Sequence, residues 1–139
     1  MATAAMHVGL SAEDIAQIQG IADEWVRVSL ARDWDGLLAL LTDDVVFLPP
    51  DAPVVVGKPA VRAFLDAFPT IKAFTATVIG GEGQPELAWA RGAFRMTIEP
   101  APGQSVSMVG KFAATYRKRA DGGWLCASDT WNLDGPLNP

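Results

Sequence analysis

The spacing of apolar residues changes from a helical to an extended pattern near the middle of the chain. From Ser11 to about Ala31, apolar residues recur at helical spacing, which predicts one long amphipathic helix. Ser11 and Asp14 are spaced as in a capping box, in which each side chain bonds the backbone of the other residue. The pattern therefore predicts both the helix and the residue at which it begins.

Two shorter helical patterns follow. Asp33 or Asp35 can cap a short helix that continues to Leu41 and ends within residues 42–44. Pro59 suits the first turn of a third helix, because proline fixes the backbone angle that this turn needs. The N-terminal half is thus expected to contain about three helices.

The second half of the chain has the alternation that is typical of strands. Short apolar runs at residues 45–48 and 54–56 indicate two brief strands before it. Turns rich in Gly and Pro then separate the long extended segments, and such turns are typical of hairpins. These segments are residues 70–80, 86–99, 105–118 and 124–133.

The order of these elements predicts the fold class. Helices first and consecutive hairpins later describe an α+β domain with helices packed on one face of a mainly antiparallel sheet. The length of 139 residues suits a single domain, which we place at residues 11–134. Residues 1–10 are Ala-rich and are expected to form a disordered tail.

Composition argues against several classes of partner. Sixteen acidic and eleven basic residues leave a net charge of -5, and no block of Lys or Arg stands out. A nucleic-acid or anionic-membrane surface is therefore not expected. The apolar runs are too short to cross a bilayer, and the N-terminus lacks the pattern of a signal peptide. We expect a cytoplasmic protein whose partners are small molecules or another protein chain.

The residue types present also limit the chemistry. His7 is the only histidine and lies in the tail, so a Ser-His-Asp triad or a multi-His metal site would lack its members. Asp43 and Asp44 have no third ligand nearby and are interpreted as a helix end. We expect no metal and no cofactor, and any acid or base must be Asp, Glu, Tyr or Lys.

Asp129 stands out because it lies in an apolar strand pattern, LCASDTWNL. If residues 125–133 are extended, Asp129 shares one face with Leu125, Ala127 and Trp131. A carboxylate among apolar groups has a raised pKa, which suits a general base. The alternative is a structural role, in which the carboxylate pairs with Arg91 or Lys111 on neighbouring strands or accepts backbone hydrogen bonds.

Three other side chains are candidates with open interpretations. Tyr116 lies on the apolar face of its strand and either donates a hydrogen bond to a ligand or is an ordinary half-buried tyrosine. Arg91 either clamps an acidic ligand group, stacks on Trp89 or lies on the solvent or dimer face. Asn132 lies on the other face of the strand from Asp129 if the strand is regular, and a bulge near the strand end would turn its side chain inward.

Two segments carry a resemblance to a known family. They are FLPPDAPVVVGKPAVRAFLDAF, residues 47–68, and GKF…YRKRADGGWLCASDTWN, residues 110–132. Over residues 11–134 the chain resembles the nuclear transport factor 2-like superfamily, and within it the SnoaL-like and ketosteroid isomerase-like domains. The resemblance implies a cystatin-like cone, in which a strongly curved sheet wraps around the helices and leaves a deep, mostly apolar pocket. It also implies a homodimer that pairs through the outer face of the sheet.

The chain departs from the ketosteroid isomerase pattern at two positions. Those enzymes place a general base just before a proline at the end of the first strand, where this chain has Leu48. The carboxylic acid that donates a hydrogen bond to the oxyanion in those enzymes falls near Gly110 of this chain. Because both chemical residues are missing here, the resemblance disfavours isomerisation of a 3-oxosteroid. In SnoaL-like polyketide cyclases, by contrast, the last strand supplies an acidic residue that acts as the base. Asp129 lies in the last strand of this chain, so the resemblance implies the same role for it.

The sequence thus predicts a pocket for an apolar small molecule, with Asp129 and Tyr116 as catalytic candidates. The expected activity is a cofactor-independent isomerase, aldol-type cyclase or hydrolase acting on an apolar carbonyl compound. The alternative is a non-catalytic module for ligand binding or dimerisation. Arg91 and Lys111 are candidates for an ion pair or a ligand clamp. The expected pocket residues are Trp25, Leu48, Phe64, Met96, Met108, Gly110, Phe112, Trp131 and Asn132.

Overall fold

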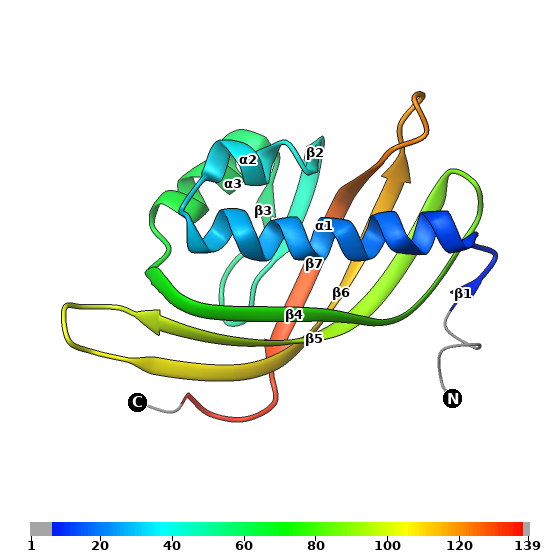
Figure 1. The fold of residues 1–139 in the computed structure, drawn as a ribbon. Coiled ribbons are helices and arrows are strands. Elements are labelled where there is room, and N and C mark those ends of the chain that lie inside the picture. The colour runs from blue at the N-terminus through cyan, green and yellow to red at the C-terminus, as the bar shows by residue number, and fades with distance from the viewer. Residues whose placement is uncertain (1–6, 138–139) are drawn as a thin grey trace.

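In the part of the chain that the structure describes, three helices lie along one face of a curved sheet (Figure 1). The computed structural model describes residues 7–137. Helix α1 spans Ala12–Leu30, and the capping box at its start is confirmed: Asp14 N donates to Ser11 Oγ at 3.0 Å, and Ser11 N donates to Asp14 Oδ2 at 3.2 Å. Helix α2 spans Trp34–Leu38, and helix α3 spans Lys58–Asp66 with a proline in its first turn.

Within residues 7–137, seven strands form a single mixed sheet. They are β1 (His7–Val8), β2 (Leu41–Leu48), β3 (Val55–Val56), β4 (Thr70–Gly83), β5 (Leu87–Glu99), β6 (Val106–Lys118) and β7 (Trp124–Leu133). Their order is β1-β4-β5-β6-β7-β2-β3, and only the β1–β4 and β2–β7 pairs are parallel. The predicted α+β class with a mainly antiparallel sheet is confirmed.

Irregular pairing bends the sheet around the helices. Strand β4 has register shifts against β5 between Ile71 and Ala73 and again between Val78 and Gly80. Bulges of this kind increase local twist and turn a strand. Figure 1 shows the long strands β4, β5 and β6 curving beneath α1, so the concave face of the sheet encloses the helices.

Two expectations about local structure were wrong. His7–Val8 pair with β4 as strand β1, so the predicted disordered tail is incorrect for these two residues, and residues 1–6 lie outside the described part. Leu41 and residues 42–44 belong to strand β2 and not to the second helix. The cause is pairing with β7: Cys126 N donates to the carbonyl oxygen of Leu40 at 2.9 Å, and Leu41 opposes Cys126.

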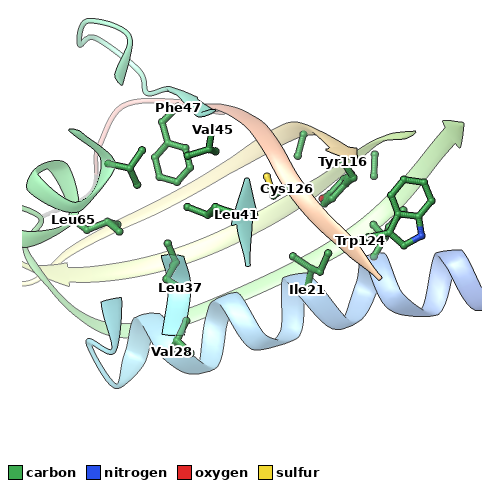
Figure 2. Packing of buried hydrophobic residues seen from close by; sticks show 14 of the residues in the cluster. Ile21, Val28, Leu37, Leu41, Val45, Phe47, Leu65, Tyr116, Trp124 and Cys126 are labelled. Carbon is green, nitrogen blue, oxygen red and sulfur yellow. The ribbon is translucent and has the colours of Figure 1, made fainter. Parts of the chain in front are cut away.

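The apolar core lies between α1 and the sheet (Figure 2). Its largest fully buried side chain is Phe47, which β2 places between the helices and β7. Tyr116 and Cys126 occupy the adjacent part of the core, as partners across the β6–β7 ladder. Within the described residues, no helix combines the length and apolar character needed to cross a bilayer.

Asp14 joins the start of α1 to the sheet. Its carboxylate accepts hydrogen bonds from Trp124 Nε1 at 3.0 Å and from Lys118 Nζ at 3.1 Å. These bonds, the one from Trp124 foremost, lower the pKa of Asp14 to about 2. The folded state therefore prefers the ionised form, which stabilises the protein above the ordinary carboxyl pKa and loses this effect as the pH falls towards 2.

Replacing Asp14 with Asn should lower the free energy of unfolding by about 1–2 kcal/mol at pH 7. The difference from wild type should shrink as the pH falls from 4 to 2, because the wild-type carboxylate then becomes protonated. Urea denaturation at several pH values measures this, with the exposed Glu13→Gln change in the same helical turn as the control. A loss of stability that does not depend on pH would show that the charge is unimportant.

Candidate functional site

A cavity of about 120 Å³ lies between the helices and the concave face of the sheet. Its wall is built by α1, α2, α3 and strands β2 and β4 to β7, and half of the lining residues are aromatic. The deep part includes Phe47 and Tyr116, which are 2% and 3% exposed, whereas Phe64, Phe68 and Phe74 are half-buried. The site is therefore an apolar pocket with few polar groups.

Aromatic rings form a continuous cluster on one side of the cavity. The ring centroid of Phe47 lies 5.8 Å from those of both Trp25 and Trp131, and 6.2 Å from that of Phe64. Phe64 also approaches Trp131, with 6.1 Å between centroids. The mutual packing of these rings fixes the shape of the wall next to β7.

A bulge in β7 decides which side chains face this cavity. Thr115 opposes Ser128 and Tyr116 opposes Cys126, so Ala127 is an extra residue in the ladder. Before the bulge, Trp124 and Cys126 point into the core, and after it Asp129 lines the cavity. The prediction that Leu125 and Asp129 share one face of the strand is therefore wrong. The prediction that Asp129 points inward is confirmed.

Asp129 lies in the cavity wall as a half-buried residue whose Oδ1 atom is buried. Its backbone lies opposite Phe47 on β2 and Ala114 on β6, both of which also line the cavity. Within the described residues, its buried Oδ1 atom has no hydrogen-bond partner. Burial among apolar groups raises the pKa of Asp129 to about 8. At pH 7 Asp129 is therefore mainly protonated.

Tyr116 is the second titratable group of the cavity. Burial, followed by the charges of Cys126 and Asp129, raises the pKa of its hydroxyl well above the ordinary value. The hydroxyl therefore stays protonated near neutral pH, and the structure records no hydrogen bond for it among residues 7–137. It can donate to an oxygen of a bound molecule.

Cys126 lies next to these groups but has no sign of reactivity. It is fully buried, and its Sγ donates to the carbonyl oxygen of Ser128 at 3.3 Å. Burial raises the pKa of the thiol well above its ordinary value, so the nucleophilic thiolate is disfavoured.

Several lining residues were not predicted from the sequence. Trp34 from α2 lines the cavity, and its buried Nε1 has no hydrogen-bond partner in the described part of the chain. Ser29 from α1 and Phe94 from β5 also contribute. Phe47 had a usable signal, since alternation along β2 buries Val45 and Phe47 on one face.

Eight of the eleven residues predicted as catalytic or pocket residues line the cavity. They are Trp25, Phe64, Met96, Met108, Phe112, Tyr116, Asp129 and Trp131. The other three predictions were wrong. Leu48 points away and is 44% exposed, because Phe47 takes the inward position. Asn132 is exposed on the outer face of the sheet, since the bulge lies upstream of Asp129 and not next to Asn132.

Gly110 is the third of these corrections. It is buried behind the cavity wall, where an added Cβ would overlap the backbone oxygen of Asn132 and the ring of Phe94. Because Phe94 lines the cavity, Gly110 makes room for that ring and does not itself contact the cavity.

The predicted structural pairing of Asp129 is also wrong. Arg91 and Lys111 lie with Asn132 around a shallow depression on the outer face, on the other side of the sheet from Asp129. Lys111 instead forms an ion pair with Asp134 at 3.0 Å and donates to the carbonyl oxygen of Leu133. Within residues 7–137, no cluster of His, Cys, Asp or Glu side chains could hold a metal ion.

Comparison with known families identifies the chain. The family model for the SnoaL-like domain matches residues 22–126, most of the chain and most of the cavity wall. The protein belongs to the SnoaL-like family. No curated protein matches this SnoaL-like chain.

Solved structures similar to this SnoaL-like protein agree on the fold. A ketosteroid isomerase-like protein from Erwinia carotovora atroseptica SCRI1043 has a TM-score of 0.80 at 21% identity, covering 91% of this chain and 100% of that chain. An NTF2-like protein with a cystatin-like fold from Novosphingobium aromaticivorans has a TM-score of 0.68 at 19% identity, and the match covers 89% of this chain and 84% of that chain. The hexachlorocyclohexane dehydrochlorinase LinA-type3 from Novosphingobium barchaimii LL02 has a TM-score of 0.75 at 15% identity, and the match covers 91% of this chain and 90% of that chain. At these identities the likeness shows the NTF2-like, cystatin-like fold alone.

Proposed function

We propose that the cavity binds a small, apolar carbonyl compound and that Asp129 is the acid–base group that acts on it. The observation that carries this proposal is the buried carboxyl group in the cavity wall, whose Oδ1 has no hydrogen-bond partner in the described part of the chain. An unpartnered buried carboxyl destabilises a protein and requires an explanation. Proton transfer to and from a ligand supplies one.

The proposed reaction begins with removal of a proton next to the carbonyl. The ionised Asp129 takes the proton from the carbon, and the C–H electron pair moves into the carbonyl group to give an enolate. The Tyr116 hydroxyl donates to the carbonyl oxygen as negative charge develops there. Return of the proton to another carbon gives an isomerase, and attack of the enolate on a second carbonyl gives an aldol-type cyclase. If Asp129 instead takes a proton from water, the water oxygen adds to the carbonyl carbon of an ester-like substrate. The bond from that carbon to the leaving group then breaks, and Asp129 returns the proton to the leaving group, which gives a hydrolase.

The cavity also limits the substrate. None of the lining residues is Lys, Arg or His, so a ligand carboxylate or phosphate would find no cationic partner. An apolar cavity of roughly 150 Å³ holds a benzene molecule. We therefore expect a compound without an anionic group, whose buried part is about the size of one ring.

Exchange of hydrogen for deuterium tests this without knowledge of the natural substrate. Indanone and cyclohexenone are incubated with the protein in D₂O, and proton NMR follows loss of the signals next to the carbonyl. We expect wild type to accelerate exchange for at least one ketone, and Ala114→Leu, which fills the cavity beside Asp129, to abolish the acceleration. Exchange that survives in the Ala114→Leu variant would place the chemistry elsewhere, and no acceleration for any ketone that binds would refute the proposal.

Tyr116→Phe should lower the accelerated exchange rate by about 10²- to 10³-fold, as expected for loss of one oxyanion donor. The ring and its packing are retained, so ketone affinity should change much less than the rate. Single-turnover exchange and equilibrium binding, measured on the same variant, separate the two effects. An equal loss in affinity and rate would make Tyr116 a binding group only.

A second candidate is a binding module without catalysis. It is favoured by the small number of polar side chains in the cavity, since Ser29, Tyr116 and Asp129 are set among mostly apolar neighbours. Such a module would bind ketones without exchanging their protons. A homodimer through the sheet face and a cytoplasmic location stay predictions from the resemblance and the composition.

A further inference from the structure

The cavity wall has an electrostatic character that favours a positive ligand. Half of its lining residues are aromatic, and the faces of aromatic rings carry partial negative charge. Its ionisable side chains are Asp129 and Tyr116, both acids, and no lining residue is cationic. A bound cation would therefore meet attraction from the rings and from the carboxylate.

The geometry places the rings and the carboxyl group together. Phe47 lies directly opposite Asp129 in the β2–β7 ladder, and Trp131 follows Asp129 on the same side of β7. The centroids of these two rings are 5.8 Å apart, with an angle of 85° between the ring planes. A cation held within about 6 Å of a ring face gains a favourable cation–π interaction. Next to it, the carboxyl group of Asp129 lines the cavity and, when ionised, can accept an N–H bond.

We propose that this cavity is a binding site for a small, apolar ammonium ion, held by a hydrogen bond to Asp129 and by contact with the aromatic rings of the wall. The proposal uses the cavity of the proposed function but not its proton transfer from carbon. A protein that exchanges no ketone protons could still bind the amine, and the reverse also holds.

Binding of such a cation should release a proton. Burial raises the pKa of Asp129 to about 8, so the empty cavity holds mainly the protonated acid at pH 7. An ammonium ion stabilises the carboxylate, and the displaced proton leaves for the solvent. Tyr116 from β6 and Cys126 from β7 are the titratable neighbours, and both stay protonated, while α1, α2, α3, β2, β4 and β5 contribute only uncharged side chains to the cavity. Affinity should therefore increase as the pH rises to about 8.

Quinuclidinium and its uncharged analogue bicyclo[2.2.2]octane are suitable probes because they share one compact shape. Tryptophan fluorescence at pH 8.5 reports binding, since Trp25 and Trp131 line the cavity. We expect the cation to bind at least tenfold more tightly than the hydrocarbon in wild type and in the control variant Asp51→Asn, whose exposed carboxylate lies outside the cavity. Asp129→Asn should remove most of this preference.

Calorimetry of quinuclidinium binding at pH 7, in two buffers with different ionisation enthalpies, counts the protons released. We expect a value close to one per bound cation. The proposal is overturned if the cation does not bind, if it binds no better than the hydrocarbon, if the preference survives in Asp129→Asn, or if no proton is released. Ketone exchange measured on the same protein is a separate result, so failure of either proposal can be recognised.

Discussion

An Asp129→Asn variant should be more stable than the wild-type protein at pH 8.5 and about equally stable at pH 4. The pKa of Asp129 is about 8 in the folded protein, and its ordinary value is 3.8. Below pH 4 the carboxyl is protonated in both the folded and the unfolded state, so it costs nothing. As the pH rises from 4 to 8, only the unfolded state gains the favourable ionised form, and wild type loses stability. Above pH 8 the loss is complete.

The size of the effect follows from the difference between the two pKa values. Each unit corresponds to about 1.4 kcal/mol, so the gain for Asp129→Asn at pH 8.5 is on the order of several kcal/mol. Asparagine has nearly the same shape and retains a polar group, which keeps the comparison close to one of charge. Guanidinium denaturation at both pH values measures the gain, with Asp51→Asn as a control that should show little change at either. A gain that is the same at pH 4 and pH 8.5 would mean that ionisation of Asp129 is not its cause.

The elements that sequence predicted well are those whose signals are local. Helix α1 begins at the predicted Ser11 cap because the hydrogen bonds of a capping box join residues three positions apart. The long strands β4 to β7 were recognisable because apolar and polar residues alternate between turns rich in Gly and Pro. Together these signals were sufficient to predict an α+β fold with helices on one face of the sheet.

The elements that sequence missed are decided by pairing with distant segments. Leu41 has the composition of a helix residue, yet it becomes strand because β7 supplies its hydrogen-bond partners from about 85 positions further along the chain. His7–Val8 form a strand because β4 offers an open edge. Neither partner is visible in a local pattern.

The candidate site was predicted in part for the same reason. Asp129 and Trp131 were placed on one face correctly, because no irregularity separates them. The bulge at Ala127 exchanged Leu125 for Trp124 and Cys126 on that face, and nothing in LCASDTWNL marks the extra residue. The choice of Leu48 over Phe47 shows a similar error of one residue, which moves a side chain to the opposite side of a strand.

The buried acid links stability to the proposed activity. An ionised Asp129 costs free energy because the cavity offers it no hydrogen-bond partner or opposite charge among the described residues. The same lack of partners makes the carboxylate a stronger base than an exposed one. A variant that gains stability by losing this acid should therefore lose activity, as is common at functional sites.

The largest expected change in activity is the loss of ketone proton exchange in Asp129→Asn, by about 10³-fold or more. General acid–base catalysis contributes about 10²- to 10⁴-fold, and the amide of asparagine cannot take up the proton at all. Ala114→Leu would also lose exchange, but by excluding the ketone, so binding must be measured as well. We expect Asp129→Asn to bind the ketone with similar affinity and Ala114→Leu not to bind it.

The dependence of this exchange on pH identifies the base more sharply than the loss alone. Since only ionised Asp129 can accept the proton, the wild-type rate should rise about tenfold per pH unit below 8 and level off above it. Tyr116 stays protonated well beyond pH 10, so the plateau should not fall before then. Exchange measured from pH 5 to pH 10, corrected for the uncatalysed rate, gives the profile. A midpoint near pH 4 would assign the base to an exposed carboxylate, since an acid that stays neutral to about pH 8 requires the apolar wall around Asp129.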